Sequence, residues 1–284
     1  ALSDWYGVYI RMPIIANGNA SNGKGNVTIV GVAKAGGIVF DSGNTYGYIF
    51  ANGNVSLIGY SGQSAGGNGI YINAIGPTLT SSTGGVIRSV SGNVTLSGYS
   101  GYNVAIYINN NSANIVATAG DITLQGATLS TNSGGAYSAS SAAIATAYTN
   151  ISNEITSAAN PLTASPTGYA TAVPGSDASG LWWGIYYSGG KLLAVNNPST
   201  VASGTAPTSG GKVTMSGSVL YASYSSTGTV DSGGGLIILD GANIYAYGAI
   251  DVTGKGIPAG ISSSYGSNFG INIWSTTTTI RSYN

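Results

Sequence analysis

The chain contains neither cysteine nor histidine among its 284 residues. A disulfide framework is therefore excluded, and so are the thiolate and imidazole ligands that most zinc sites use. Charge is also scarce: eight basic and eight acidic residues give a formal net charge of +0. Nucleic-acid binding requires clustered Lys and Arg to neutralise phosphates, and the few basic residues here do not cluster. We therefore expect no nucleic-acid partner.

Long hydrophobic runs are missing as well. No uncharged apolar segment reaches the roughly 18 residues that a membrane-spanning helix needs, so we expect no membrane span. The sequence begins ALSDWYG, without Met or a signal peptide, which suggests a processed product or a piece of a longer protein. Hydrophobic residues nevertheless make up 43% of the chain and 20 residues are Tyr. This is more apolar and aromatic content than disordered chains carry.

One seven-residue pattern, G-x-V-T-L-x-G, recurs along the chain. Its seven copies begin at Gly25, Gly53, Gly92, Gly120, Gly211, Gly235 and Gly248. Each copy reads as a short strand between glycine turns, in which the third and fifth residues share one face. The expected inward pairs are Val27/Ile29, Val55/Leu57, Val94/Leu96, Ile122/Leu124, Val213/Met215, Ile237/Leu239 and Ile250/Val252.

A second strand type, exemplified by GIYI, recurs between these heptads. It begins at Gly7, Gly37, Gly69, Ala105, Gly184 and Gly270. The residues that we expect to point outward from it are Tyr9, Val39, Tyr71, Tyr107, Tyr186 and Asn272. The first four copies are separated by 30, 32 and 36 residues. A period of this size indicates a repeat architecture in which stacked units share one core.

The pattern predicts an all-β protein, a parallel β-helix (β-solenoid) with one inserted segment. Near-identical heptads need near-identical environments, which successive coils supply, and Ser, Thr and Asn can hydrogen-bond between like positions on neighbouring coils. At about 25 residues per coil we expect roughly nine coils. The alternative is a β-sandwich, a pilin-like subunit joined to its neighbours by strand exchange, because a sandwich also uses short alternating strands.

The expected organisation is coils over residues 1–126, an insertion over residues 127–180, and coils again over residues 181–284. Apolar residues at helical spacing between Ile144 and Ala158, followed by Pro161, favour a short helix in the insertion. A long extended or disordered loop is the other interpretation.

The tandem G-x-V-T-L-x-G strands and the run GLIILDGANIYAYGAIDVTGKG (235–256) resemble the filamentous-haemagglutinin-like exoproteins of Gram-negative bacteria. That resemblance covers everything outside the insertion. It implies a long right-handed parallel β-helix that acts as an adhesin or surface fibre. The chain departs from the family in its high Tyr content, its very low charge and the lack of a recognisable secretion domain.

Catalysis is not expected. Asp121, Asp240 and Asp251 fall near heptad strands, but isolated carboxylates without a base partner do not make a reaction. The calcium-binding repeat G-G-x-G-x-D needs an Asp in every unit, which most heptads lack. We therefore expect no enzyme activity, no metal and no cofactor.

Aromatic residues are the candidates for contact with a ligand or partner. They are Tyr9, Tyr71, Tyr107 and Tyr186, with Trp5, Trp182 and Trp183 just before two of the same strands. If the GIYI strands stack, these rings form a row. The row either stabilises the sheet by cross-strand aromatic pairing, which is the favoured interpretation, or serves as a platform for sugars or another filament.

We therefore expect a structural or adhesive unit of an extracellular, cell-surface bacterial filament or giant adhesin. Its partners would be other copies stacked end to end, or adjacent repeats of the same polypeptide. The alternative is a carbohydrate-binding module that uses the Tyr/Trp face to bind surface glycans.

Overall fold

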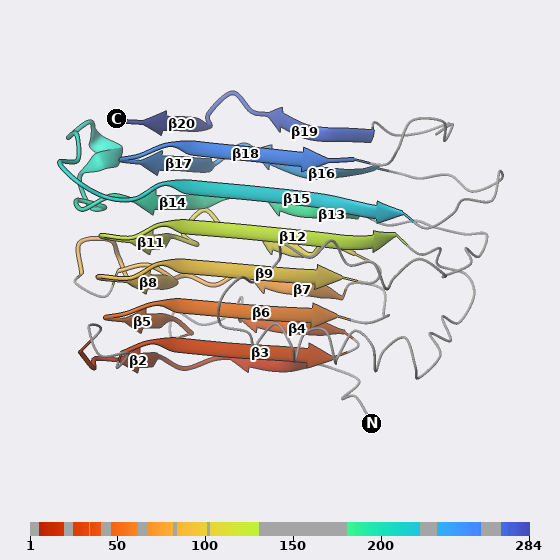
Figure 1. The fold of residues 1–284 in the computed structure, drawn as a ribbon, viewed down its shortest axis with the longest axis horizontal. Helices are drawn as coiled ribbons and strands as arrows, with labels where there is room; N and C mark the ends of the chain where they lie inside the picture. The colour runs from red at the N-terminus through yellow and green to blue at the C-terminus, as the bar shows by residue number, and fades with distance from the viewer. Residues whose placement is uncertain are drawn as a thin grey trace.

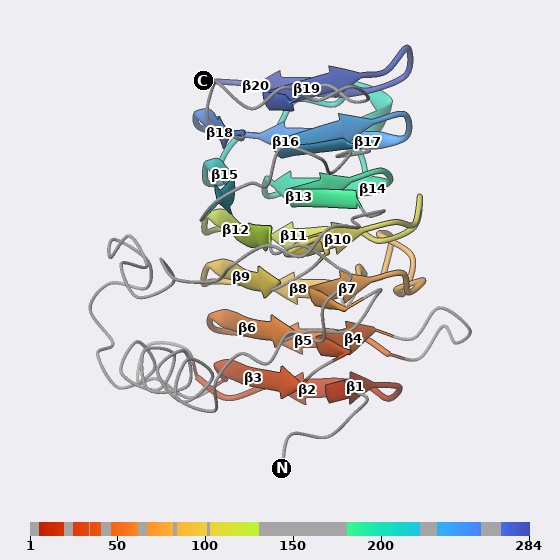
Figure 2. The same cartoon turned by 90° about the vertical axis from the view of Figure 1, so that its right-hand side faces the viewer.

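The computed structural model describes residues 6–19, 25–33, 35–40, 47–61, 67–81, 84–100, 103–130, 181–221, 232–256 and 268–284. Within these ranges almost all regular structure is β, the exception being the short 3-10 helix η2 (Val201–Ser203). The strands lie in three sheets that stack along one axis (Figures 1 and 2).

Sheets A and B each contain seven strands. Sheet A consists of β1 (Tyr6–Ile10), β4 (Gly36–Phe40), β7 (Asn68–Ile72), β10 (Ile106–Ile108), β13 (Leu181–Tyr187), β16 (Ser232–Leu239) and β19 (Asn268–Trp274). Sheet B consists of β2 (Ile14–Ala16), β5 (Ile49–Ala51), β8 (Ile87–Ser89), β11 (Ile115–Ala117), β14 (Gly190–Ala194), β17 (Ala242–Ala246) and β20 (Thr279–Ser282).

Sheet C contains six strands and is built from the heptads. Its members are β3 (Val27–Ala33), β6 (Val55–Ser61), β9 (Val94–Ser100), β12 (Ile122–Ser130), β15 (Val213–Tyr221) and β18 (Ile250–Lys255). Each strand from β1 to β17 pairs in parallel with the strand three places later in the chain, for example β6 with β9 and β9 with β12. This pattern is that of a β-solenoid, and it confirms the predicted fold class over the β-sandwich.

The number of coils differs from the prediction. The described residues form seven coils rather than nine, and the last of them lacks a sheet C strand. Aligned positions in the first four coils, Tyr9, Val39, Tyr71 and Tyr107, are 30, 32 and 36 residues apart. Aligned positions on sheet C are as close as 28 residues, as in Val27 and Val55, so a coil with three strands and three corners takes more than the 25 residues assumed from the two strand types visible in the sequence.

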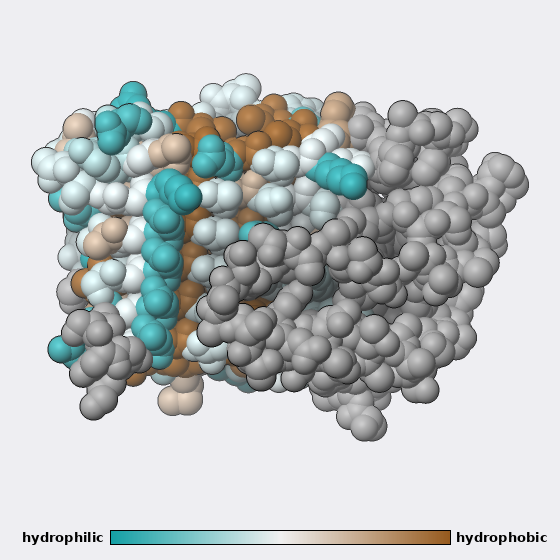
Figure 3. All heavy atoms as spheres, viewed as in Figure 1, coloured by the Kyte–Doolittle hydropathy of each residue, from teal (hydrophilic) through white to brown (hydrophobic). Residues whose placement is uncertain are grey.

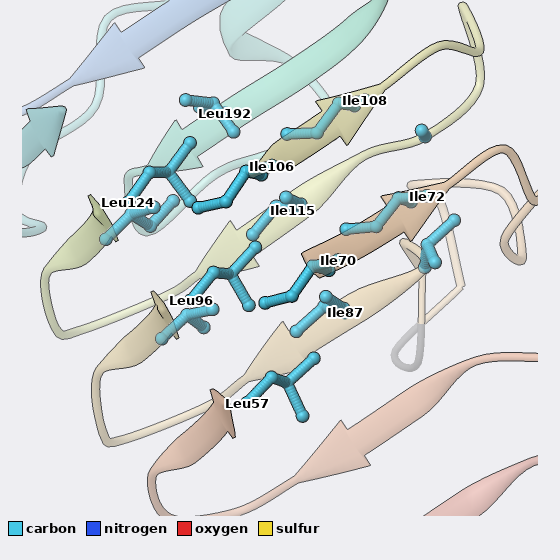
Figure 4. Close-up of a cluster of buried hydrophobic side chains, with 14 of the residues drawn as sticks. Leu57, Ile70, Ile72, Ile87, Leu96, Ile106, Ile108, Ile115, Leu124 and Leu192 are labelled. Atoms are coloured by element: carbon cyan, nitrogen blue, oxygen red, sulfur yellow. The ribbon is translucent and has the colours of Figure 1, made fainter. Parts of the chain in front are cut away.

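The core is a stack of like residues on like residues. Leu57, Leu96 and Leu124 follow one another on sheet C, and Ile70 and Ile106 lie beside them on sheet A (Figure 4). All five are fully buried. Burying a side chain of this size contributes about 1.5–3 kcal/mol, so the repeated pair in each heptad is the main source of stability.

The predicted inward pair of the heptad GLIILDG is wrong, because this heptad does not belong to sheet C. GLIILDG lies in β16 of sheet A, where Leu236 aligns with Ile185 and Ile237 aligns with Tyr186. The inward pair is therefore Leu236 and Ile238, both fully buried, instead of Ile237 and Leu239. The four residues LIIL are all apolar, so this heptad lacks the alternation of polar and apolar residues that identifies the inward pair in the other heptads.

Gly98 marks the corner where sheets C and A meet. A Cβ atom at this position would collide with the carbonyl oxygen of Ala105. The register aligns a glycine here in all six strands of sheet C, from Gly31 to Gly254. The second glycine of the heptad thus allows two backbones to approach more closely than any side chain permits.

Sheet B and the insertion boundary were not fully anticipated. Some outer side chains of sheet B are apolar and covered: Val116 and Leu193 are fully buried because Val201 of η2 and Leu79 pack over them. Strand β12 continues to Ser130, four residues beyond the expected boundary at 126. The helix expected between Ile144 and Ala158 lies outside the described residues.

Candidate contact face

The outer face of sheet A carries the aromatic row expected from the sequence. Its column reads, coil by coil, Tyr9, Val39, Tyr71, Tyr107, Tyr186, Ile237 and Asn272. The predicted stacking of the GIYI strands is confirmed, with Ile237 occupying the sixth position. Because Val39 separates Tyr9 from Tyr71, the uninterrupted aromatic part is three rings long.

These three rings pack against one another rather than forming a flat platform. The ring centroids of Tyr71 and Tyr107 are 5.2 Å apart with planes tilted by 40°, and those of Tyr107 and Tyr186 are 4.8 Å apart at 69°. Tilted and edge-on arrangements are those in which aromatic rings attract each other most. The geometry matches cross-strand stabilisation of the sheet, with part of each ring still reaching solvent.

Two phenol groups of the row, those of Tyr107 and Tyr186, have a raised pKa. Partial burial, together with Tyr186 and Tyr71 on either side, raises the pKa of Tyr107 to about 12. Burial also raises the pKa of Tyr186. At one end, the side-chain amide nitrogen of Asn73 donates a hydrogen bond of 3.0 Å to the Tyr71 hydroxyl. The Tyr107 and Tyr186 phenols therefore stay uncharged at neutral pH and present hydroxyl groups and ring edges on this face.

Trp183 does not extend this row. Trp183 is only 3% exposed, because its indole ring lies over Gly234 and packs in a cluster with Val104 and Ile237. Its ring is edge-on to that of Tyr186 at 6.5 Å. Trp183 is thus part of the apolar layer beneath the face rather than an exposed contact.

The other two tryptophans predicted for the face are Trp182 and Trp5. Trp182 lies in β13 and pairs with Gly233, but its side chain lies outside the described structure. Trp5 lies outside the described residues altogether. The sequence pattern does not predict the contact of Val104 with this cluster, and it wrongly predicts that Ile237 points into the core. Aligning GLIIL with GIYY, instead of with the heptads, identifies the outward position of Ile237.

Tyr9 belongs to a separate aromatic group at the first coil. Its side chain is 41% exposed and stacks on Tyr6 with a centroid distance of 5.1 Å and an angle of 14°. The Arg11 guanidinium lies 5.1 Å from the centroid of the Tyr9 ring, within the range of a cation–π interaction. Tyr6 is 40% exposed, so both rings of this group reach solvent.

A second ordered feature follows the starts of the sheet C strands. The Oδ1 atom of Asn26 accepts a hydrogen bond from the backbone N–H of Asn54, and Asn54, Asn93 and Asp121 accept in the same way from the next coil, ending on Lys212. We call this series the asparagine ladder. It accounts for a hydrophilic column across these strands in Figure 3. The predicted hydrogen bonding between like positions is confirmed here.

Asp121, Asp240 and Asp251 are the acidic residues within the described part of the chain. Asp240 lies after β16, where its carboxylate accepts hydrogen bonds from Ser275 Oγ and the Thr276 N–H, and these bonds lower its pKa. Asp251 lies on the outer side of β18, aligned with Thr214. Across the part of the chain that the structure describes, no three Asp or Glu residues gather as potential metal ligands.

Comparisons with protein-family models, with curated proteins and with solved structures returned no match. Within the described ranges, no helix has the length and hydrophobicity needed to cross a bilayer.

Proposed function

We propose that the chain is a structural and adhesive segment of an extracellular bacterial filament or giant surface adhesin. The solenoid would continue along its axis, through further coils of the same polypeptide or through another copy. The extracellular setting follows from the resemblance to filamentous-haemagglutinin-like proteins.

The observation that carries this proposal is the state of the two end faces. Ile273 of β19 occupies an inward position, aligned with the fully buried Ile238, yet it is 53% exposed. Ile280 of β20 aligns with the fully buried Ile244 and is 40% exposed. Open strand edges with apolar residues beside them are templates for association, and repeat proteins that remain monomeric cover them with polar caps.

The first coil supports the same conclusion. Strands β1, β2 and β3 are the edge strands of the three sheets, and Met12 and Ile15 near this edge are 74% and 51% exposed. The coils between the ends share one continuous core and parallel hydrogen-bonded sheets. Such a body resists bending, which suits a fibre.

Axial association tests the proposal. We expect the chain to associate with increasing concentration in sedimentation velocity experiments, and we expect Ile273→Asp to abolish the association because it places a charge on the end face. Asn272→Asp is the matched control, because the side chain of Asn272, next to Ile273, lies on the outer face of the same strand. A wild-type chain that stays monomeric at all concentrations, or equal association of both variants, would contradict association between copies.

A carbohydrate-binding module is the second candidate, and the partly exposed Tyr71, Tyr107 and Tyr186 row favours it. Saturable glycan binding by a monomeric chain, weakened in Tyr107→Ala and retained in Ile273→Asp, would support this function instead.

A further inference from the structure

Three residues of the asparagine ladder begin an N-x-S/T motif, the acceptor sequence of N-glycosylation. They are Asn26, Asn54 and Asn93, which directly precede β3, β6 and β9. A fourth motif that lies wholly within the described ranges begins at Asn110. The four motifs look alike in sequence, so the geometry of each side chain decides which amide can carry a sugar.

The ladder holds each of its amide groups in one orientation. The Oδ1 atom of Asn26 accepts a hydrogen bond of 2.8 Å from the backbone N–H of Asn54, so this oxygen points toward the next coil. A Cβ atom on Gly53 would collide with the same oxygen, and one on Gly92 would collide with Oδ1 of Asn54. The first glycine of the heptad therefore leaves space for the amide oxygen, and the amide nitrogen lies on the other side of the group.

The amide nitrogens of the three ladder residues are open to reaction. The Nδ2 atoms of Asn26, Asn54 and Asn93 donate no hydrogen bond to any other described residue, and all three residues are exposed. The hydroxyl group of the motif lies on the same side as the amide, because residues two apart in a strand share one face. Thr28 is exposed and Ser56 is partly exposed. Both parts of the motif therefore reach solvent together.

Asn110 carries the motif in a closed arrangement. Its Nδ2 atom donates to the backbone oxygen of Asn73 at 3.3 Å and to the Oδ1 atom of Asn73 at 3.4 Å. Its own Oδ1 atom accepts a hydrogen bond of 2.9 Å from the backbone N–H of Ser112. A sugar on this nitrogen would disrupt the bonds to Asn73, whereas a sugar on Asn54 would disrupt none.

We propose that Asn26, Asn54 and Asn93 are N-glycosylation sites and that Asn110 is not. The donor is an activated sugar whose anomeric carbon carries a diphosphate leaving group. The Nδ2 atom forms a bond to that carbon as the bond from the carbon to the diphosphate oxygen breaks, and one Nδ2 proton passes to the released diphosphate. The Oδ1 atom remains an amide oxygen, so the modified residue keeps its hydrogen bond to the next coil.

The three sugars would form a column along the side of the solenoid. Their sites belong to successive coils, about 4.8 Å apart, in the hydrophilic column that faces the viewer in Figure 3. Only 6% of the residues are charged, whereas an ordinary soluble domain has about 25%. Sugar hydroxyls supply hydration that the scarce charges do not. The inference goes beyond the proposed function, because the column leaves both end faces open and hinders contact between the sheet C faces of neighbouring fibres.

Peptide mapping by mass spectrometry tests the sites in the full chain isolated from the cells that produce it. A saccharide on Asn26, Asn54 and Asn93, and none on Asn110, is the expected result. Absence of a saccharide from any of the three, or equal occupancy of Asn54 and Asn110, would overturn the inference. An unmodified chain that forms fibres would refute the glycan column and leave the filament proposal standing. A glycosylated chain that stays monomeric would do the reverse.

Substitutions in the producing cells separate the motif from the ladder. Ser56→Ala removes the hydroxyl of the motif and keeps the ladder bond, so the saccharide of Asn54 alone should be lost. Thr123→Ala is the matched control, because Thr123 occupies the same position in β12 but follows Asp121 and belongs to no motif. Asp121→Asn completes a further motif and should add a saccharide at position 121, which Thr123→Ala in the same chain should abolish. Retention of the Asn54 saccharide in Ser56→Ala, or no added saccharide in Asp121→Asn, would overturn the inference.

Discussion

The side-chain oxygen of Asn54 accepts a hydrogen bond of 2.8 Å from the backbone N–H of Asn93, 39 residues later in the chain. The same bond recurs between Asn93 and Asp121, where the distance is 2.9 Å. Each bond joins like positions on adjacent coils, outside the strand ladders themselves. The heptad therefore repeats its Asn for a reason distinct from its Val and Leu: the side chain fixes the start of the next strand.

Removing one acceptor of the asparagine ladder should have a measurable cost. We expect Asn54→Ala to lower the free energy of unfolding by about 1 kcal/mol, the typical net contribution of a hydrogen bond. Asn54→Asp should lose much less, because Asp121 fills the same role in its own coil. Urea denaturation measures both changes. Ser56→Ala, on the outer side of β6, is the control, and equal losses for all three variants would refute a role for the ladder.

The corner between sheets A and C should tolerate no side chain at Gly98. We expect Gly98→Ala to destabilise the chain by about 1–3 kcal/mol, as overpacking in a dense core does, because its Cβ would meet the carbonyl oxygen of Ala105. At Gly248 the nearest atom to a Cβ is 3.4 Å away. Gly248→Ala should therefore be neutral or slightly stabilising. Thermal unfolding of the two variants makes the comparison, and similar melting temperatures would contradict the close approach.

The Tyr107 hydroxyl should make stability depend on alkaline pH. Its pKa is raised to about 12 in the folded chain, whereas an unfolded Tyr ionises near its ordinary value of 10. Between these two values the unfolded state releases a proton that the folded state retains, so stability falls as pH rises. Below pH 10 the stabilising contribution of the Tyr107 phenol is fully present.

Urea midpoints measured at pH 8, about 10 and about 11.5 test this dependence. We expect the decline to be shallower in Tyr107→Phe, which lacks the ionisable group. Identical pH profiles for Tyr107→Phe and the parent chain would show that the phenol is not shielded as the row implies.

Asp240 should tie the seventh coil to the sixth in an acid-sensitive way. Its pKa is lowered by the hydrogen bond from Ser275 and by the N–H of Thr276. The contribution of a carboxylate with a lowered pKa is present above its unfolded pKa and is lost as pH falls through the folded value. We expect Asp240→Ala to lower the protection factor of the Thr276 amide near neutral pH, and acidification below pH 4 to do the same in the parent chain. Asp251→Ala, on β18, should leave this protection factor unchanged.

Much of this fold was readable from the sequence because sheets A and C repeat their residues. The inward pairs Val94/Leu96 and Ile122/Leu124 are fully buried as predicted, and Tyr71 aligns with Tyr107. Equivalent environments select equivalent residues, and the register follows from the repetition.

Sheet B escaped notice for a physical reason. Its strands are as short as three residues, and loops cover its outer face, so Val116 is buried although it points away from the core. Where the outer face of a strand is covered, its residues can be apolar on both faces, and the alternation of polar and apolar residues that predicts a strand is lost. The same loss of alternation placed Ile237 in the core. Burial of Trp183 depends on Gly234 in the next coil, a contact that no local pattern records.

Electron microscopy of the native material, with helical analysis of any fibres, tests the central claim most directly. The account predicts thin fibres with a strong spacing of about 4.8 Å along the fibre axis, since the strands of all three sheets stack in that direction. Discrete particles that never join, or fibres without this axial spacing, would contradict it.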